Sequence, residues 1–143
     1  MCYKLGDQTN YALEGAVEIA GAALEWTKSI GLFKDASEVE PEARTVEDNG
    51  DTYFVPAFNG IFSPYWRDDA RGMIIGISSH TKKGHLARAL MEAPCFRTDE
   101  VVSAMAKDSG IKVTSMAVDG GLSVSNLCMQ TQADIADVEI VRK

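Results

Sequence analysis

The apolar and polar residues along this 143-residue chain recur with two different periods. Apolar positions repeat at helical spacing in three segments, whereas shorter apolar runs bounded by turn residues are typical of strands. Helices are predicted over 14–28, 85–107 and 123–135. Strands are predicted over 53–55, 73–77, 113–118 and 138–141, with a short extended piece over 11–13. The pattern therefore indicates an α/β domain.

The second half of the chain predicts the topology. From residue 73 onward the elements follow the order strand, helix, strand, helix, strand. This order requires right-handed crossovers and a sheet that is at least partly parallel. The run 73–77 is apolar throughout, which favours a strand buried on both faces. Ser123 is expected to cap the last helix, with Val124 on its inward face, and Pro94 interrupts the backbone bonding of the long helix.

Two segments between these elements carry less regular patterns. Residues 34–51 are acidic and predict a short helix over Ala36–Ala43 followed by a solvated turn over 48–51. Residues 56–72 are rich in proline, glycine and aromatic residues, and loops of this length are often functional. Within this loop, residues 64–72 place aromatic side chains beside fixed charges. They are interpreted either as a binding loop or as anchors on the core.

Composition narrows the functional classes. The chain has 14 Lys and Arg against 21 Asp and Glu, a formal net charge of −7. This charge disfavours a nucleic-acid groove and a polybasic membrane anchor, and no apolar run reaches the length of a membrane span. Cys2, Cys95 and Cys128 include no C-x-x-C pair, which favours a reducing, cytoplasmic compartment. No His, Cys and carboxylate cluster has metal-site spacing, so no metal site is predicted. Packed thiols and surface imidazoles are favoured over a catalytic Cys or His, so no catalytic residue is predicted.

The sharpest candidate site is Val118-Asp119-Gly120-Gly121, a predicted strand end followed by paired glycines and a helix. Glycine lets a ligand approach the backbone because no Cβ blocks the way. Ligands of open α/β sheets bind at the carboxyl ends of strands, and the N–H groups of a following helix favour anions or polar ligand edges. A tight turn without any ligand explains the same residues, so both interpretations stay open.

A second candidate lies on the first predicted helix. Gly21 and Glu25 are four residues apart and therefore share one helix face. A glycine inside a helix costs roughly 1 kcal/mol relative to alanine. In return it leaves a flat patch against which a planar ring can lie. Close packing of the helix against a sheet explains this glycine equally well.

A series of short motifs runs along the chain. They are Tyr11-Ala12-Leu13-Glu14-Gly15, Ala20-Gly21-Ala22 with Trp26, Val55-Pro56-Ala57-Phe58, Pro64-Tyr65-Trp66, Ala70-Arg71-Gly72, Val118-Asp119-Gly120-Gly121 and Met129-Gln130 followed by Gln132-Ala133-Asp134-Ile135. Taken together, these motifs resemble the FGGY family of carbohydrate kinases, and its glycerol kinase branch in particular. The run 72–77, followed after seven residues by 85–92, is similar to the second signature of the wider family.

The resemblance implies a fold and a reaction. Residues 1–143 would be most of the C-terminal of two actin-like, ribonuclease-H-like ATPase domains, with a mixed sheet and crossover helices. The N-terminal domain and the final helix are expected to be absent. The full-length enzyme would transfer the γ-phosphoryl group of ATP, with Mg²⁺, to glycerol. The Mg²⁺ ligands and the groups that act on the γ-phosphate are expected outside this chain, which is therefore expected to be inactive alone. A homo-oligomer is a further expectation.

The resemblance also implies which residues contact the adenosine part of ATP. These are Gly21, Glu25, Gly120, Gly121 and Ser125, with Asn126 one place later as a substitute for Ser125. The glycines match the family, whereas Gln usually stands at position 25 and Asn at position 125. A carboxylate accepts hydrogen bonds but donates none, so Glu25 alters that contact. Two alternatives stay open: a non-catalytic remnant or interaction module, and another FGGY sugar kinase.

Overall fold

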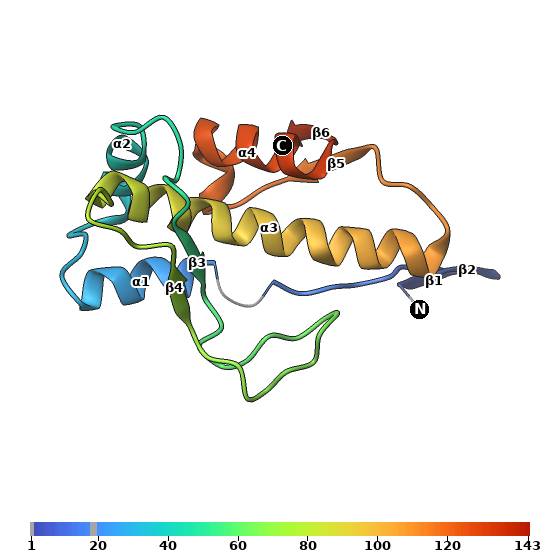
Figure 1. Cartoon of the computed structure of the whole chain (residues 1–143). Coiled ribbons are helices and arrows are strands. Elements are labelled where there is room, and N and C mark those ends of the chain that lie inside the picture. Colours follow the sequence, from blue (N-terminus) through green and yellow to red (C-terminus); the bar gives the residue numbers. More distant parts are fainter. Residues whose placement is uncertain (1, 18–19) are drawn as a thin grey trace.

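One long helix organises the computed structural model, which describes residues 2–17 and 20–143. Helix α3 spans Lys83–Ser109 and runs through the middle of the molecule. In Figure 1, α2 (Val39–Ala43) and α4 (Asn126–Ala136) lie on one side of it. Helix α1 (Gly21–Ser29) lies on the other side. The predicted long helix is thereby confirmed.

The described residues form three two-stranded sheets. Strands β1 (Tyr3–Leu5) and β2 (Gln8–Asn10) form an antiparallel hairpin that the sequence did not predict. Strand β3 (Tyr53–Val55) pairs antiparallel with β4 (Met73–Ile75). Strand β5 (Ser115–Val118) pairs parallel with β6 (Glu139–Arg142), and α4 makes the crossover between them.

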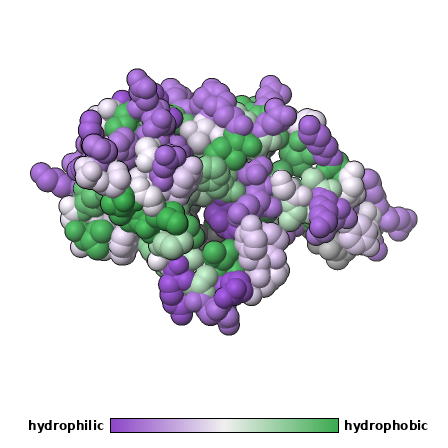
Figure 2. Space-filling model, viewed as in Figure 1, coloured by the Kyte–Doolittle hydropathy of each residue, from purple (hydrophilic) through white to green (hydrophobic). Residues whose placement is uncertain are grey.

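The topology prediction is therefore correct for the last three elements and wrong for β4. That strand does not join β5. It returns along β3 because residues 56–72 reverse the chain between the two strands. Its burial also differs from the prediction. Met73 and Ile75 are 51% and 52% exposed, and only Ile74 packs against the core. Figure 2 shows apolar residues gathered on this face, over α1 and β4.

Helix α1 begins at Gly21, later than its apolar spacing predicts. Residues 14–17 are neither helix nor strand, and residues 18–19 of the predicted helix lie outside the described residues. Gly15 passes so close to α3 that a Cβ at this position would meet the side chain of Val101. This contact with α3 overrides the helical pattern of the segment. The predicted end holds, because α1 stops at Ser29 and Gly31 takes a φ of +75°.

The core lies where α3 meets the surrounding helices. Small residues on α3 allow this close approach, and Ala87 of α3 and Ala43 of α2 are both fully buried. Phe33, which follows α1, is 1% exposed within the same cluster. Helix α1 is joined to β3 by Trp26, whose ring stacks on Phe54 at 5.7 Å between centroids. Offset aromatic pairs of this kind add to the area they bury.

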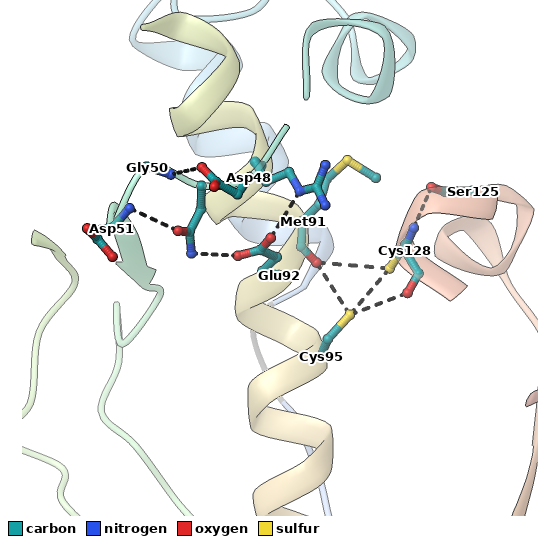
Figure 3. Close-up of polar contacts among 10 residues, drawn as sticks. Asp48, Gly50, Asp51, Met91, Glu92, Cys95, Ser125 and Cys128 are labelled. Carbon is teal, nitrogen blue, oxygen red and sulfur yellow. Dashed lines mark hydrogen bonds and ion pairs between the residues drawn. The ribbon is translucent and has the colours of Figure 1, made fainter. Parts of the chain in front are cut away.

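The acidic segment folds as predicted, into a short 3₁₀ turn η1 (Ala36–Glu38) that runs into α2. The turn over 48–51 is held by its own side chains. Asp48 accepts from the N–H of Gly50 at 2.8 Å, and Asn49 donates to Glu92 of α3 at 2.8 Å. Glu92 also pairs with Arg88 at 3.1 Å. Figure 3 shows this turn fastened to α3 by polar contacts.

The start of α4 differs from the prediction. The helix is capped by Ser125, whose Oγ accepts from the N–H of Cys128 at 3.0 Å, and not by Ser123. Ser123 lies in a preceding 3₁₀ turn, η2 (Gly121–Val124), and donates its hydroxyl to the carbonyl of Gly120 at 2.7 Å. Val124, expected to point inward, is 80% exposed. The helix therefore starts three residues later than predicted, and Val124 lies outside it.

Glu40 connects α2 to this helix start. Its Oε1 receives hydrogen bonds from Arg44 at 2.9 and 2.6 Å, and the N–H of Leu127 approaches it at 3.4 Å. Burial by itself would raise the pKa of Glu40, but hydrogen bonds from Ser125, Arg44 and Leu127 outweigh it and hold that pKa below its ordinary value of 4.5. A carboxylate in this place also complements the positive end of the α4 dipole.

The position of Gly76, directly after β4, predicts a stability defect. Its φ is +83°, and a Cβ would fall on the carbonyl oxygen of Asp51. We expect Gly76→Ala to lower the free energy of unfolding by about 3 kcal/mol in urea denaturation, because backbone strain and a backbone clash add. Gly110→Ala is the matched control. Its φ is +70° with nothing within 4 Å, so it should cost only about 1 kcal/mol. Equal losses in the two variants would contradict the clash.

The lowered pKa of Glu40 predicts a pH-dependent contribution to stability. A carboxylate whose pKa is depressed in the folded state stabilises the fold above its unfolded pKa, and this stabilisation is lost as the pH falls through the folded value. Glu40→Gln should therefore be less stable than the parent at pH 7, and the gap should close as the pH falls below 4.5. Urea denaturation across pH 3–7 measures the gap. A gap of constant size over this range would show that the charge of Glu40 contributes nothing.

Candidate functional site

The turn after β5 has a backbone that only glycine adopts readily. Gly120 takes a φ of +96° with a ψ of −176°. Asp119 fixes the turn by accepting from the N–H of Gly120 at 2.7 Å. The carbonyl of Gly120 in turn accepts from both the N–H and the hydroxyl of Ser123, at 3.1 and 2.7 Å. The strand end is therefore held in one conformation before the chain enters α4.

Both glycines of this turn face open space. Gly120 and Gly121 are exposed, and no atom of the described residues lies within 4 Å of a Cβ built on either one. A flat ligand group can therefore lie directly on this backbone. Tight packing does not explain the glycine at position 121. The φ of Gly121 lies outside the left-handed region, and a side chain built there would meet no neighbouring atom.

The N-terminus of α4 is already occupied by groups of the chain itself. The N–H of Cys128 bonds to Ser125 Oγ, and that of Leu127 approaches Glu40 Oε1. A carboxylate thus sits where an anionic ligand group would otherwise bind. Ser125 is 8% exposed and directs its hydroxyl to Glu40, whereas Asn126 is exposed at the first residue of the helix. The turn is better suited to a neutral ligand edge than to a phosphate.

The α1 candidates form a second group on the surface. Gly21 is exposed, and no described atom lies within 4 Å of a Cβ built on it, so close packing against a sheet does not explain this glycine. Glu25 is one turn further on and pairs with Lys28, whose Nζ lies 2.9 Å from its Oε1. The hydrogen bond to Glu25 raises the pKa of Lys28. The pair removes most of the net charge that Glu25 alone would bring to this face.

The structure thus places the six predicted residues in two groups. Gly120, Gly121, Ser125 and Asn126 belong to one strand–turn–helix unit, while Gly21 and Glu25 belong to α1. Residues next to each group, Leu122 and Ala23, pack into one apolar cluster. Among the described residues, no hydrogen bond or cavity joins the two groups directly.

Sequence reasoning missed the polar network that fixes the 56–72 loop. Arg97 of α3 donates to the carbonyl of Ser63 at 2.8 Å and pairs with Glu100, which also accepts from the Tyr65 hydroxyl at 3.0 Å. The spacing of Arg97 and Glu100 on one helix face was the available signal. The network borders a cavity of about 510 Å³, lined mainly by apolar residues of β3, α3 and the loop.

The carboxylates of this loop do not form an acid–base pair. Asp69 receives two hydrogen bonds from the Arg67 guanidinium, both at 2.7 Å, and these lower its pKa to about 2. Over residues 2–17 and 20–143, no three His, Cys, Asp or Glu side chains gather as a metal site. In the same described part of the chain, no helix has the length and apolarity needed to cross a membrane.

Known proteins resemble the chain along its whole length. A glycerol kinase of Chloroflexus aurantiacus is 53% identical over 99% of this chain, which spans 29% of that relative. The crystal structure of Plasmodium falciparum glycerol kinase with ADP superposes with a TM-score of 0.81 at 34% identity, over 86% of this chain and 24% of that one. A ligand-bound xylulose kinase of Lactobacillus acidophilus gives a TM-score of 0.76 at 26% identity, over 85% of this chain and 25% of that one.

These matches confirm the predicted fold class, the actin-like, ribonuclease-H-like α/β fold of the sugar kinases. They also confirm the resemblance to glycerol kinases. Residues 2–143 match the C-terminal domain of the FGGY family of carbohydrate kinases. The chain therefore belongs to the FGGY family of carbohydrate kinases.

Proposed function

We propose that this chain is part of a glycerol kinase, which transfers the γ-phosphoryl group of ATP to glycerol. The observation that carries the proposal is the 53% identity to a glycerol kinase over 99% of the chain. Identity to the xylulose kinase structure is only 26%, so glycerol is favoured over other acceptors within the family. The chain spans 29% of the Chloroflexus aurantiacus glycerol kinase. The activity is therefore proposed for the longer protein, and the chain alone is expected to be inactive.

In this proposal the chain supplies the adenosine side of the nucleotide cleft. Gly21 and the pair Gly120 and Gly121 present backbone without side chains, which suits contact with a planar base and its ribose. Glu40 belongs to α2, but its carboxylate lies beside the start of α4 and would repel a phosphate there. The phosphates of ATP would therefore lie away from this helix. Asn126, exposed beside the turn, is the remaining side chain that can donate a hydrogen bond to the ligand.

The other parts of the proposal rest on the resemblance. Mg²⁺ would accompany ATP and would be held by residues of the other domain, which would also act on the γ-phosphate. The cytoplasmic location, the homo-oligomer and the assignment of residues 1–143 to a C-terminal domain without its final helix stay predictions. This chain's own contribution is to orient the nucleotide from one side of the cleft.

A non-catalytic remnant is the second candidate function. The observation that favours it is that Ser125 is turned inward, where its hydroxyl caps α4 and bonds to Glu40. Together with an acidic Glu25, this leaves fewer donors for a nucleotide than the family usually provides. In a remnant the glycine turn would persist without binding ATP.

A chimeric enzyme separates the two candidates. The matching segment of the Chloroflexus aurantiacus glycerol kinase, 53% identical, is replaced by residues 1–143 of this chain. A coupled assay should detect glycerol-dependent ADP formation. Gly121→Val in the chimera should raise the KM for ATP roughly tenfold or more, because the new side chain fills the open face of the turn.

Ser103→Val, on an exposed position of α3, is the matched control and should leave the KM for ATP unchanged. A folded chimera that forms no ADP would favour the remnant.

The ion pair between Glu25 and Lys28 on α1 predicts that replacing either partner changes the KM for ATP in opposite directions. In the same chimera, Glu25→Gln should lower the KM for ATP about two- to fivefold, because it removes negative charge and restores a hydrogen-bond donor. Lys28→Gln should raise it by a similar factor, because Glu25 loses the cation that neutralises it. Initial rates at varied ATP, with saturating glycerol, measure both. Unchanged values in both variants would place α1 outside the nucleotide site.

A further inference from the structure

Two buried thiols meet where α3 packs against α4. Cys95 is 1% exposed and Cys128 is 2% exposed, and their Sγ atoms lie 3.7 Å apart. Figure 3 shows the two side chains pointing at each other from the two helices. Neither thiol takes part in the proposed nucleotide site, and both cysteines are free.

The surroundings of the pair leave the sulfurs available to each other. Cys95 Sγ lies 3.5 Å from the carbonyl of Met91 and 3.6 Å from that of Cys128, while Cys128 Sγ is 4.0 Å from the Met91 carbonyl. A disulfide bond is about 2.05 Å long, so the sulfurs need to approach by less than about 2 Å. This is the scale of side-chain and small helix adjustments. The pair is thus close to a bonded geometry.

The two thiols differ in acidity. Cys128 lies in the first turn of α4, where the positive end of the helix dipole stabilises a thiolate. The hydrogen bond between the sulfurs lowers the pKa of Cys128 and raises that of Cys95. Burial of both thiols and the charge of Glu40 near Cys128 act against ionisation. Cys128 is therefore the attacking sulfur and Cys95 the resolving one.

A small cavity gives access to the pair. It has a volume of about 150 Å³ and is lined by both cysteines together with Pro94, Met116, Asp119 and Ser123. A molecule the size of a peroxide fits this space, since a water occupies about 30 Å³ of liquid. Asp119 belongs to the turn after β5, so the cavity borders that turn.

We propose that Cys95 and Cys128 form a dithiol modification site, which a peroxide oxidises to a disulfide between α3 and α4. The Cys128 thiolate attacks a peroxide oxygen, the O–O bond breaks, and Cys128 becomes a sulfenic acid as one water leaves. The Cys95 sulfur then attacks the Cys128 sulfur, forming the S–S bond and releasing the second water. The two thiols lose two electrons in total, and the peroxide gains them. The site is independent of the proposed kinase activity.

The experiment uses the 143-residue chain with Cys2→Ser, which removes the exposed third thiol. After treatment with hydrogen peroxide, the chain is unfolded and alkylated with iodoacetamide, and its intact mass is measured. The expected result is that neither Cys95 nor Cys128 is alkylated. The chain should then be about 2 Da lighter than the reduced, unalkylated chain, because two hydrogens are lost. Trypsin should release peptide 89–97 linked to peptide 113–142, and dithiothreitol should separate them.

Cys95→Ser and Cys128→Ser, each added to Cys2→Ser, should abolish the linked peptide. Circular dichroism before oxidation verifies that each chain is folded, and the result for the Cys2→Ser chain stands even where a second variant does not fold. Two alkylatable thiols after peroxide would overturn the proposal. So would oxygen addition at one cysteine without a linked peptide, or a disulfide between two chains.

Discussion

Close packing along one face of α3 is the constraint on which the rest of the structure depends. A long helix cannot bury its own apolar stripe, so other elements must cover it. Alanines on α3 let α2 approach until Ala43 and Ala87 are fully buried, and α4 packs further along the same helix through Cys128. The 56–72 loop is then fastened to α3 by Arg97, Glu100 and Tyr65. Each segment takes its position from this helix.

This arrangement leaves the candidate nucleotide residues on the surface, except the buried Ser125, while fixing the elements that carry them. The glycine turn is held from below by Ser123 and Leu122, and α4 is capped by Ser125. Glu40 then fills the electropositive end of α4 with a carboxylate from α2. In the proposed site, the glycines would form a neutral contact surface, and the phosphates of the nucleotide would need cations from elsewhere.

Much of the fold could be predicted from the sequence where the signal was local. The strand at 53–55, the long helix and the parallel pair around α4 follow from periodicity, because each requires only its own apolar spacing. The glycines of the turn were also identified from sequence, because they stand between a strand and a helix. The start of α1 and the cap of α4 were not predicted, because Gly15 against Val101 and Ser125 beside Glu40 are contacts between distant segments. The hairpin 3–10 was missed because its two strands are largely exposed and carry no apolar run.

The sequence by itself determined the family, the helices and strands of the second half, and the glycines that can admit a ligand. It did so because motifs and periodicity are properties of neighbouring residues. Only the tertiary structure decided that β4 pairs with β3, that Ser125 is turned inward, and that Cys95 and Cys128 face each other. Each of these depends on residues 18 to 85 positions apart in the chain, brought together when α3 buries its apolar face. Partners at such separations leave no local pattern, because packing alone selects them.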